Sequence, residues 1–378
     1  MRIVRLSRFL PPKVGGLEFH VLELTRRQSL LGHQLEVFYA QGQPPPLPGV
    51  RWTRVPLPGW AGRVGSNLVQ SLAFAWGARR LLAAAGAQAD LVHAHGDIGE
   101  AVATWLAGRR LGCPAVLTLH GELNGALAYR LVARLLFRLP RRLLVVSPRI
   151  RDTLESLGVP AERIRVFSSG VDCAAAAQPD PGLEADLRAE LGLEAGCPVV
   201  ISVGRLHPVK GYGYLVEAGK QVLDRCPRAR ILIVGEGEER PRLTQAIRAE
   251  HRIVLAGQRS RAEVFALLRL GSVFVLPSVD LGSQAEGSPS SILEAMAAGL
   301  PVVVSDSGGL ARLIHPGEHG YVVPERSAGA LAERILHLLE HPEEAARIGG
   351  TNARVAAERD WGRQARAITE SCQELVER

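Results

Sequence analysis

The sequence predicts an α/β protein made of two doubly wound domains, each with a parallel sheet. Short apolar runs rich in β-branched residues alternate with helical patterns along the chain, which indicates βαβ units. The 378 residues are enough for two cores of ordinary size. A polar, proline-containing segment at 173–198 has no strand pattern. We therefore expect Rossmann-like domains at 1–172 and 173–357, facing each other across a cleft, and a last helix at 358–378.

Twelve runs are expected to form strands, and they fall into two sets. The strands of the first domain are expected at 3–6, 35–40, 91–95, 115–120, 143–147 and 164–171. Those of the second domain are expected at 199–204, 231–235, 253–257, 273–278, 302–306 and 321–324.

A regular apolar repeat marks the last helix. Trp361, Ala365, Ile368, Cys372 and Leu375 recur at helical spacing and give one apolar face. No strand pattern follows, so this face must pack on one of the two sheets already built. The sheet of the second domain is the nearer partner along the chain, and the sheet of the first domain is the alternative.

Charge and composition narrow the class of protein. The net charge is +7 and the chain has only three lysines beside many arginines, a balance that suits acidic partners such as phosphates. The arginines are spread without a basic tail or an aromatic-interleaved strand, so no nucleic-acid partner is expected. No apolar stretch reaches the roughly 20 residues that span a bilayer. The chain begins as a strand and its five cysteines lack zinc-type spacing, so we expect a cytoplasmic protein with reduced thiols.

The segment AEGSPSSILEAMAAGLPVVVSD combines two carboxylates with a predicted helix start. Glu286 lies in the loop before the helix and Glu294 lies inside it. The backbone N–H groups of Ser290 and Ser291 fall in the first turn, where a helix favours a phosphate. Carboxylates accept hydrogen bonds from sugar hydroxyls, so this arrangement suits a nucleotide sugar. A capped helix with two solvated acids is the alternative interpretation.

Two cations follow a predicted buried strand in ISVGRLHPVKG. The strand ends at Gly204, and Arg205 and Lys210 come next. Ligands of doubly wound domains bind at the carboxyl ends of strands, and fixed cations there would stabilise a departing diphosphate. Lys210 is notable because the chain uses arginine almost everywhere else. A surface lysine is the alternative.

The first domain offers a glycine pair and several histidines near strand ends. Gly15 and Gly16 follow the first strand, and paired glycines let a backbone approach a ligand closely. His120 closes the strand AVLTLH and could donate to a sugar hydroxyl or phosphate oxygen. His93 and His95 share one face of their strand, but no third metal ligand is evident, and no Asp-x-Asp pair follows a strand. We predict no metal site.

Together these segments resemble the family 4 glycosyltransferases, retaining enzymes with the two-domain architecture called GT-B. The resemblance runs over nearly the whole chain. It rests on ordered motifs that include GHQLEVF, DLVHAHG, TLHG, VSPRIRDTL, SGVD, VGRLHPVKG, ILIVGEGEE, VFVLPS and EGSPSSILEAMAAGLPVV.

The resemblance implies a hexosyl-type transferase that moves a sugar from a nucleoside-diphosphate sugar to a saccharide or lipid-linked acceptor, in polysaccharide or glycolipid biosynthesis. The second domain would hold the nucleotide, with Arg205 and Lys210 on its phosphates and Glu294 on the ribose hydroxyls. Such enzymes generally need no metal ion, and no cofactor is expected. The helix at 358–378 would cross back to the N-terminal domain.

The resemblance also assigns residues around the sugar. Glu286 would contact the transferred sugar. Gly16 would approach the sugar–phosphate linkage from the first domain, and His120 would lie across from the sugar. The acceptor would bind to the first domain and its loops. Retention would proceed by front-face attack or through a covalent intermediate on a carboxylate such as Glu286, and the sequence leaves both routes open.

The sequence departs from the family pattern at two places. Ser169 stands where many members have asparagine, and Ala311-Arg312 stands where many have Pro-Glu. The stretch SVDLGSQ before Glu286 resembles the loop of members that build exopolysaccharides. A sugar-nucleotide epimerase and a non-catalytic nucleotide-sugar binder are the alternatives, and the presence of Arg205, Lys210 and Glu294 favours the transferase.

The basic stretch at 129–142, YRLVARLLFRLPRR, admits two interpretations. Its leucine, valine and phenylalanine positions could belong to the core. Alternatively, it could form an arginine-flanked face that rests on an anionic membrane, which would make the protein peripheral at the inner face of that membrane.

Overall fold

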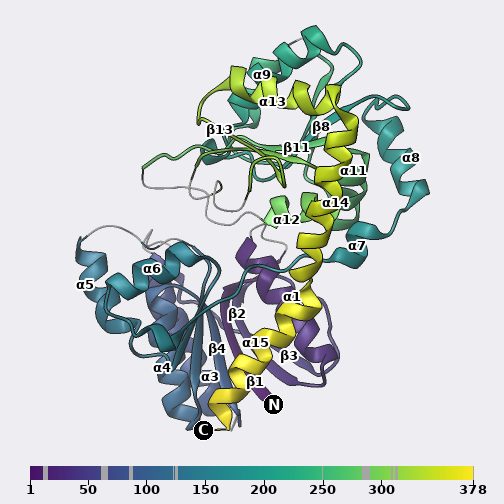
Figure 1. The fold of residues 1–378 in the computed structure, drawn as a ribbon. Coiled ribbons are helices and arrows are strands. Elements are labelled where there is room, and N and C mark those ends of the chain that lie inside the picture. Colours follow the sequence, from purple (N-terminus) through teal and green to yellow (C-terminus); the bar gives the residue numbers. More distant parts are fainter. Residues whose placement is uncertain are drawn as a thin grey trace. The chain divides into compact units, whose positions relative to one another are not determined.

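The structure is a computed structural model of the chain, and it divides into two compact units (Figure 1). Unit 1 contains Met1–Ser169 and Trp361–Arg378, and unit 2 contains Gly170–Asp360. The sequence places these boundaries at 172/173 and 357/358. The residues described by the structure are 1–11, 16–60, 67–84, 88–121, 123, 127–248, 250–282, 290–307, 310 and 314–377.

Unit 1 is built on a seven-stranded parallel sheet with the order β3-β2-β1-β4-β5-β6-β7. Its strands are β1 Arg2–Phe9, β2 Gln34–Gln41, β3 Val50–Arg54, β4 Leu91–Gly96, β5 Ala115–Leu119, β6 Arg142–Val145 and β7 Ile164–Val166. The sequence analysis missed β3, an edge strand whose residues are at most half-buried. The strand expected at 164–171 was too long, because β7 ends at Val166.

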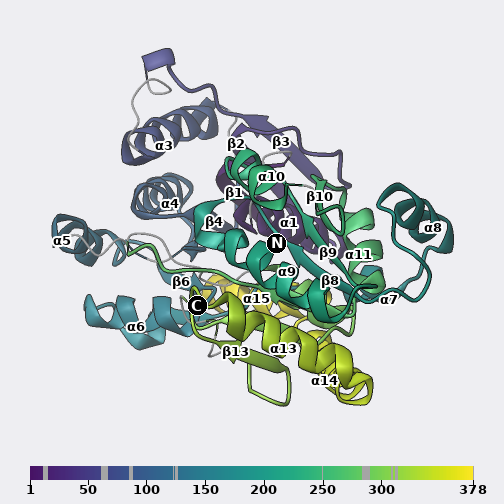
Figure 2. The ribbon, with the colours of Figure 1, turned by 90° about the horizontal axis from the view of Figure 1, so that it is seen from above.

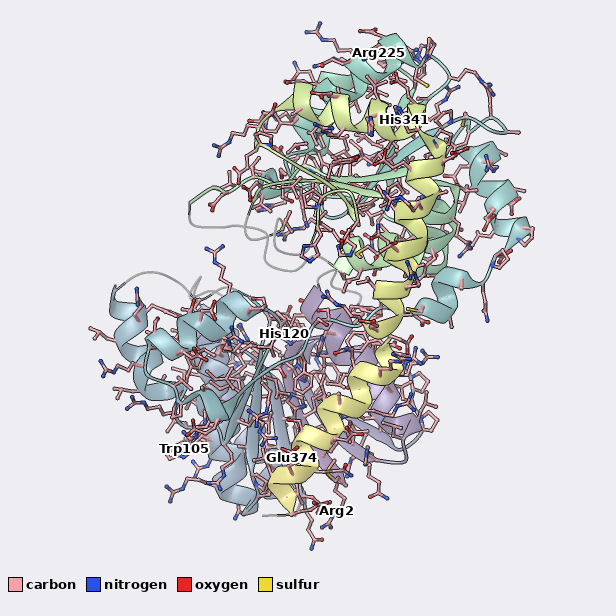
Figure 3. All side chains as sticks on the ribbon, in the orientation of Figure 1. Arg2, Trp105, His120, Arg225, His341 and Glu374 are labelled. Atoms are coloured by element: carbon pink, nitrogen blue, oxygen red, sulfur yellow. The ribbon has the colours of Figure 1, made fainter. Side chains whose placement is uncertain are left out.

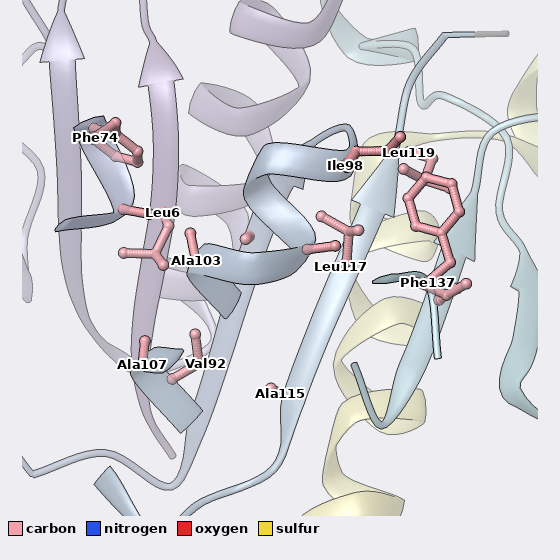
Figure 4. Packing of buried hydrophobic residues seen from close by; sticks show 14 of the residues in the cluster. Leu6, Phe74, Val92, Ile98, Ala103, Ala107, Ala115, Leu117, Leu119 and Phe137 are labelled. Atoms are coloured by element: carbon pink, nitrogen blue, oxygen red, sulfur yellow. The ribbon is translucent and has the colours of Figure 1, made fainter. Parts of the chain in front are cut away.

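Side chains alternate between the two faces of the sheet along each strand of unit 1, so its core has two layers, one on each face. Val4 and Leu6 point to one side, while Ile3 points to the other. The helices of this unit are α1 Gly16–Leu30, α3 Asn67–Ala84, α4 Ile98–Leu111, α5 Leu127–Leu136, α6 Pro148–Ser156 and α15 Trp361–Val376, with a 3-10 turn at Ala161–Arg163. Helices α3, α4, α5 and α6 pack on the side of Leu6 (Figures 2 and 4). Helices α1 and α15 pack on the opposite side.

Helix α15 therefore packs on the sheet of unit 1. Its Trp361 is 1% exposed and shares a core with Ile3 of β1 and Leu24 of α1. Two polar contacts reinforce the packing: Arg142 of β6 donates to Oγ of Ser371 at 2.8 Å, and Gln28 of α1 donates to Thr369 at 2.9 Å. Although α15 follows unit 2 in the sequence, its apolar face completes the core of unit 1.

Unit 2 contains a six-stranded parallel sheet with the order β10-β9-β8-β11-β12-β13. Its strands are β8 Val199–Val203, β9 Arg230–Val234, β10 Ile253–Gly257, β11 Val273–Leu276, β12 Val302–Ser305 and β13 Gly320–Val323. Two parallel Rossmann-like sheets confirm the predicted fold class. The six strands predicted for this half all overlap the observed ones.

Helices cover both faces of the sheet of unit 2. They are α7 Cys173–Ala177, α8 Pro181–Glu190, α9 Tyr212–Arg225, α10 Arg240–Ile247, α11 Arg261–Leu270, α12 Ser290–Ala297, α13 Ala328–Glu340 and α14 Pro342–Glu358. Helices α9, α10 and α13 contribute to one core layer, while α7, α8, α11 and α12 contribute to the other. In the described part of the chain, no helix is both long enough and apolar enough to cross a bilayer.

Candidate active site

The loop that follows β8 carries the predicted phosphate-binding cations. Gly204 comes directly after the strand, Arg205 is exposed, and Lys210 ends a 3-10 turn at Pro208–Lys210. A Cβ added to Gly204 would lie 3.7 Å from Nζ of Lys210 and 2.8 Å from the hydroxyl of Tyr212. The ammonium of Lys210 therefore folds back over the end of β8.

Glycines hold this loop in a fixed shape. Gly211 has φ +62°, and a Cβ there would lie 2.0 Å from the carbonyl oxygen of Pro277, which follows β11. Gly235, after β9, has φ +145°, and its Cβ would lie 2.0 Å from the carbonyl oxygen of Gly204. The amide of Leu206 donates to the carbonyl of Glu236 at 2.9 Å. Close backbone contacts therefore lock the loops after β8 and β9 together, and only glycine fits at these points.

The loop and helix α12 leave the sheet at its topological switch point. From β8 the chain builds outward through β9 and β10, and then returns to add β11 on the other side of β8. Ligands of open parallel sheets bind outside the carboxyl ends of the strands where this reversal occurs. Lys210 follows β8 and helix α12 follows β11, so both predicted phosphate-binding elements belong to this one place in unit 2.

Helix α12 starts at Ser290 as described, and Ser291 is buried. The first-turn N–H groups of a helix lack intrahelical partners and attract anions. Glu294 is 8% exposed, and its Oε1 accepts a hydrogen bond from Arg261 of α11 at 3.0 Å. Arg261 also lies over the ring of Phe265, 4.9 Å from its centroid. The sequence analysis missed Arg261, because its contact with Glu294 spans 33 residues and two helices.

Unit 1 brings four histidines together at the carboxyl ends of β4 and β5 (Figure 3, where His120 is labelled). Nδ1 of His95 and Nε2 of His120 are 3.0 Å apart. The rings of His93 and His95 stack with their centroids 4.3 Å apart, and His20 of α1 meets His120 edge-on at 4.6 Å. His93 is anchored by a 2.7 Å contact between its Nε2 and the hydroxyl of Thr118. His20 has no local signal in the sequence that links it to the other histidines, because it lies on a different element, α1.

Burial keeps these imidazoles neutral. Burial lowers the pKa of His120 to about 3. The pKa values of His20, His93 and His95 lie well below 6.5, chiefly because of burial and further because of neighbouring positive charge. Both ring nitrogens of His20 and Nε2 of His95 are buried and have no hydrogen-bond partner among the described residues. Near neutral pH, each ring therefore has one N–H donor and one acceptor nitrogen.

Three of these imidazoles have a geometry that could hold a metal ion. Ring nitrogens of His20, His95 and His120 all lie within 4.8 Å of one another. Arg5, which is fully buried and sits beside His93 in the register of β1 and β4, lowers the pKa of His20, His93 and His95. The same positive charge would disfavour a cation.

The predicted site residues are thus found in two groups. Gly204, Arg205, Lys210, Ser290, Ser291 and Glu294 surround the switch point of unit 2. Gly16 begins α1 and is exposed, and His120 follows β5 in unit 1. Gly15 and Glu286 lie outside the described residues.

Two family models match the chain in sequence order. One is described as Glycosyltransferase Family 4 and matches residues 14–175, and the other is described as glycosyl transferases group 1 and matches residues 197–341. The alpha-D-kanosaminyltransferase of Streptomyces kanamyceticus is 30% identical over 307 residues, which cover 76% of this chain and 77% of that protein. A putative colanic acid biosynthesis glycosyltransferase of Salmonella typhimurium is 32% identical over 237 residues. That match covers 61% of this chain and 55% of the relative, or about half its length.

Solved structures share the fold. The protein HepE of Anabaena in complex with UDP has a TM-score of 0.77 at 22% identity, over 99% of this chain and 100% of that chain. HepE has also been solved with UDP-glucose. The two parallel-sheet units define a protein of the GT-B class. Together with the matches in sequence, they show that the chain belongs to the family 4, or group 1, glycosyltransferases.

Proposed function

We propose that the protein is a retaining, metal-independent glycosyltransferase without a cofactor. It moves a hexosyl group from a nucleoside-diphosphate sugar to a saccharide or lipid-linked acceptor, in polysaccharide or glycolipid synthesis of the exopolysaccharide type. The observation that carries this proposal is the position of Lys210, whose ammonium lies over Gly204 at the switch point of unit 2. The complexes of HepE with UDP and UDP-glucose support a UDP-sugar as the donor to test first.

Arg205 and Lys210 would act on the leaving diphosphate. Each cation contributes about 4 kcal/mol at 4 Å when the effective dielectric constant is near 20. Negative charge on the departing phosphate grows as the glycosidic bond breaks, so preplaced cations lower the barrier as well as strengthening binding. The N–H groups of Ser290 and Ser291 would add donors from the first turn of α12.

Glu294 would bind the ribose hydroxyls. A carboxylate that is already held in one orientation loses less entropy when it accepts from two neighbouring hydroxyls, and the 3.0 Å bond from Arg261 holds Glu294 in this way. Arg261 is therefore proposed as a positioning residue. Truncating Arg261 would weaken nucleotide binding without removing any group that touches the phosphates.

In unit 1 we assign His120 to the transferred sugar and Gly16 to the approach of the backbone toward the sugar–phosphate linkage. A neutral His120 can donate one hydrogen bond to a sugar hydroxyl. Glu286 and Gly15 keep the roles that the family resemblance gives them. In front-face retention, the acceptor oxygen bonds to the anomeric carbon as the diphosphate leaves, and the diphosphate takes the proton of the acceptor hydroxyl.

A donor screen tests the proposal. Purified protein with EDTA is heated with UDP-, GDP- and ADP-sugars, and slow hydrolysis of each sugar is followed in parallel. One donor should raise Tm and be hydrolysed, and the released sugar should keep its anomeric configuration in NMR spectra. Arg205→Ala and Lys210→Ala should reduce turnover far more than nucleotide affinity. Lys220→Ala is the matched control, because Lys220 is exposed on α9 and donates to a backbone carbonyl.

The outcomes separate the alternatives. Conversion of one nucleotide sugar into another without an acceptor would establish an epimerase instead. Binding without any turnover would establish a non-catalytic binder. Equal losses in turnover and affinity in Lys210→Ala would count against stabilisation of the transition state, and loss of activity with EDTA would refute metal independence.

A further inference from the structure

Helices α3 and α5 of unit 1 expose rows of large apolar side chains. On α3, Leu68, Leu72 and Trp76 recur every four residues and are 45%, 41% and 58% exposed. On α5, Leu131 and Leu135 are 60% and 67% exposed. Large exposed apolar side chains that recur along one face of a helix in this way are typical of interaction sites. The interpretation of 129–142 as core was therefore wrong for these two leucines.

Both rows point away from the same face of the sheet. The inner side of α3 contributes Phe74 and Ala78 to the core layer below, and the inner side of α5 contributes Ala133 to the same layer. At 100° per residue, Trp76 and Leu135 lie on the far sides of their helices. Helix α4 contacts both α3 and α5 and lies between them. Figures 1 and 2 show the three helices on one side of the strands of unit 1.

The same three helices are strongly basic. They carry six arginines, all exposed: Arg79, Arg80, Arg109, Arg110, Arg130 and Arg134. Their one carboxylate, Glu100, is 1% exposed and pairs with Arg8 at 2.7 Å. This outer surface of α3, α4 and α5 therefore presents positive charge and apolar side chains with no exposed acid from the helices themselves.

Two tryptophans on this surface are stacked with arginines. Arg79 lies over the ring of Trp76 at 5.7 Å, and Arg109 lies over the ring of Trp105 at 5.3 Å. Tryptophan prefers the boundary between lipid headgroups and acyl chains. Arginine buries its stem there while its guanidinium stays among the phosphates.

We propose that the outer surface of α3, α4 and α5 docks on an anionic phospholipid bilayer. Charge complementarity selects this partner, because six arginines face the negative headgroups while the leucines and Trp76 enter the acyl boundary. A nucleic acid would satisfy the arginines but leave Leu131 and Leu135 in water. The proposal is independent of the reaction, since binding to vesicles needs no donor or acceptor.

Vesicle co-sedimentation with the full chain tests the proposal. The protein should sediment with vesicles containing phosphatidylglycerol at low salt and stay in solution with pure phosphatidylcholine. Each arginine near an anionic surface changes the partition by about fivefold, so Arg79→Gln with Arg134→Gln should weaken binding by about 25-fold. Trp76→Ser with Leu135→Ser should weaken it at low and high salt alike. Both pairs replace exposed side chains, so folding should be unaffected.

Matched controls lie on the opposite face of unit 1. Arg363→Gln with Arg366→Gln removes the same charge from exposed positions on α15, and Leu30→Ser removes a leucine that is 67% exposed on α1. These variants should bind vesicles within about twofold of the parent protein. The proposal is overturned if the parent chain does not bind anionic vesicles at low salt, or if the control pair loses as much binding as Arg79→Gln with Arg134→Gln. A dimer in light scattering that Trp76→Ser dissolves would assign the surface to a second copy instead.

Discussion

The buried histidines of unit 1 are the residues with the clearest dependence on pH. An unfolded chain binds a proton at each histidine near pH 6.5, whereas His20, His93, His95 and His120 resist protonation because they are buried. Below about pH 6.5 the unfolded state therefore binds more protons than the folded state. The contribution of these histidines to the free energy of unfolding is therefore fully present above that pH. It is lost as the pH decreases toward the low pKa values of the folded protein.

We expect His93→Gln to flatten this dependence. Burial lowers the pKa of His93, so its removal should reduce the slope of unfolding free energy against pH below pH 6.5, by at most about 1.4 kcal/mol per pH unit. To measure the slope, unit 1 is unfolded with urea at several pH values, and hydrogen exchange reports its free energy of unfolding at each pH. His251→Gln, at an exposed position in unit 2, is the control. An unchanged slope in His93→Gln would mean that His93 already carries a proton in the folded state.

His95 is expected to set which nitrogen His120 offers to the sugar that we propose it binds. Their 3.0 Å contact forces one ring to donate and the other to accept, so it sets which nitrogen of His120 carries the proton. His95→Phe should keep the stacking but change the tautomer of His120, which nitrogen-15 NMR of the imidazoles detects in the protein without substrate. Turnover should fall while donor affinity stays within about threefold. An unchanged tautomer would remove His95 from this role.

At the scale of elements, the loop after β8 depends on one glycine. In Gly211→Ala a Cβ would meet the carbonyl of Pro277 at 2.0 Å, and φ is +62°. We expect the loop to shift and Lys210 to leave its place, so that the rise in Tm produced by donor or UDP is lost. Gly213→Ala is the control, because α9 holds this residue in helical geometry and nothing lies within 4 Å of its added Cβ. That variant should keep the ligand response and gain up to about 1 kcal/mol of stability.

Local sequence patterns predicted the helices and strands well, but they predicted few of the contacts between these elements. The apolar runs located every strand except β3, whose VRWTR sequence lies at an edge and has no buried side. Glycine and charge patterns after β8 identified Arg205 and Lys210. The pair formed by Arg261 and Glu294 joins two helices, and His20 reaches His120 from α1, so neither contact has a local signal. For α5 the sequence left a core face and an exposed face open, because Leu131 and Leu135 are residues that occur in either, and their exposure decides for the second.

At the scale of the molecule, α15 makes unit 1 discontinuous in sequence. Trp361 is almost fully buried beneath the sheet of unit 1, so Trp361→Ala should destabilise that unit by about 3–5 kcal/mol. Hydrogen exchange should become faster in β1, β4 and α1, while α9 and α13 of unit 2 keep their protection. Trp76→Ala is the matched control, since this side chain is 58% exposed and its loss should cost no more than about 0.5 kcal/mol. Equal acceleration in both units would show that they unfold as one.

Because α15 is synthesised after unit 2 but packs in unit 1, unit 2 can complete its folding on the ribosome before unit 1 does. Residues Gly170–Asp360 form unit 2 without help from any later segment, so it can close as soon as it has emerged. The sheet of unit 1 is synthesised first, yet the side covered by α15 stays bare until the last residues appear. Although domains generally fold in the order of their synthesis, here the first half of the protein must wait for the second. A stalled chain would carry a finished unit 2 and an exposed apolar sheet of unit 1, the kind of surface that chaperones capture.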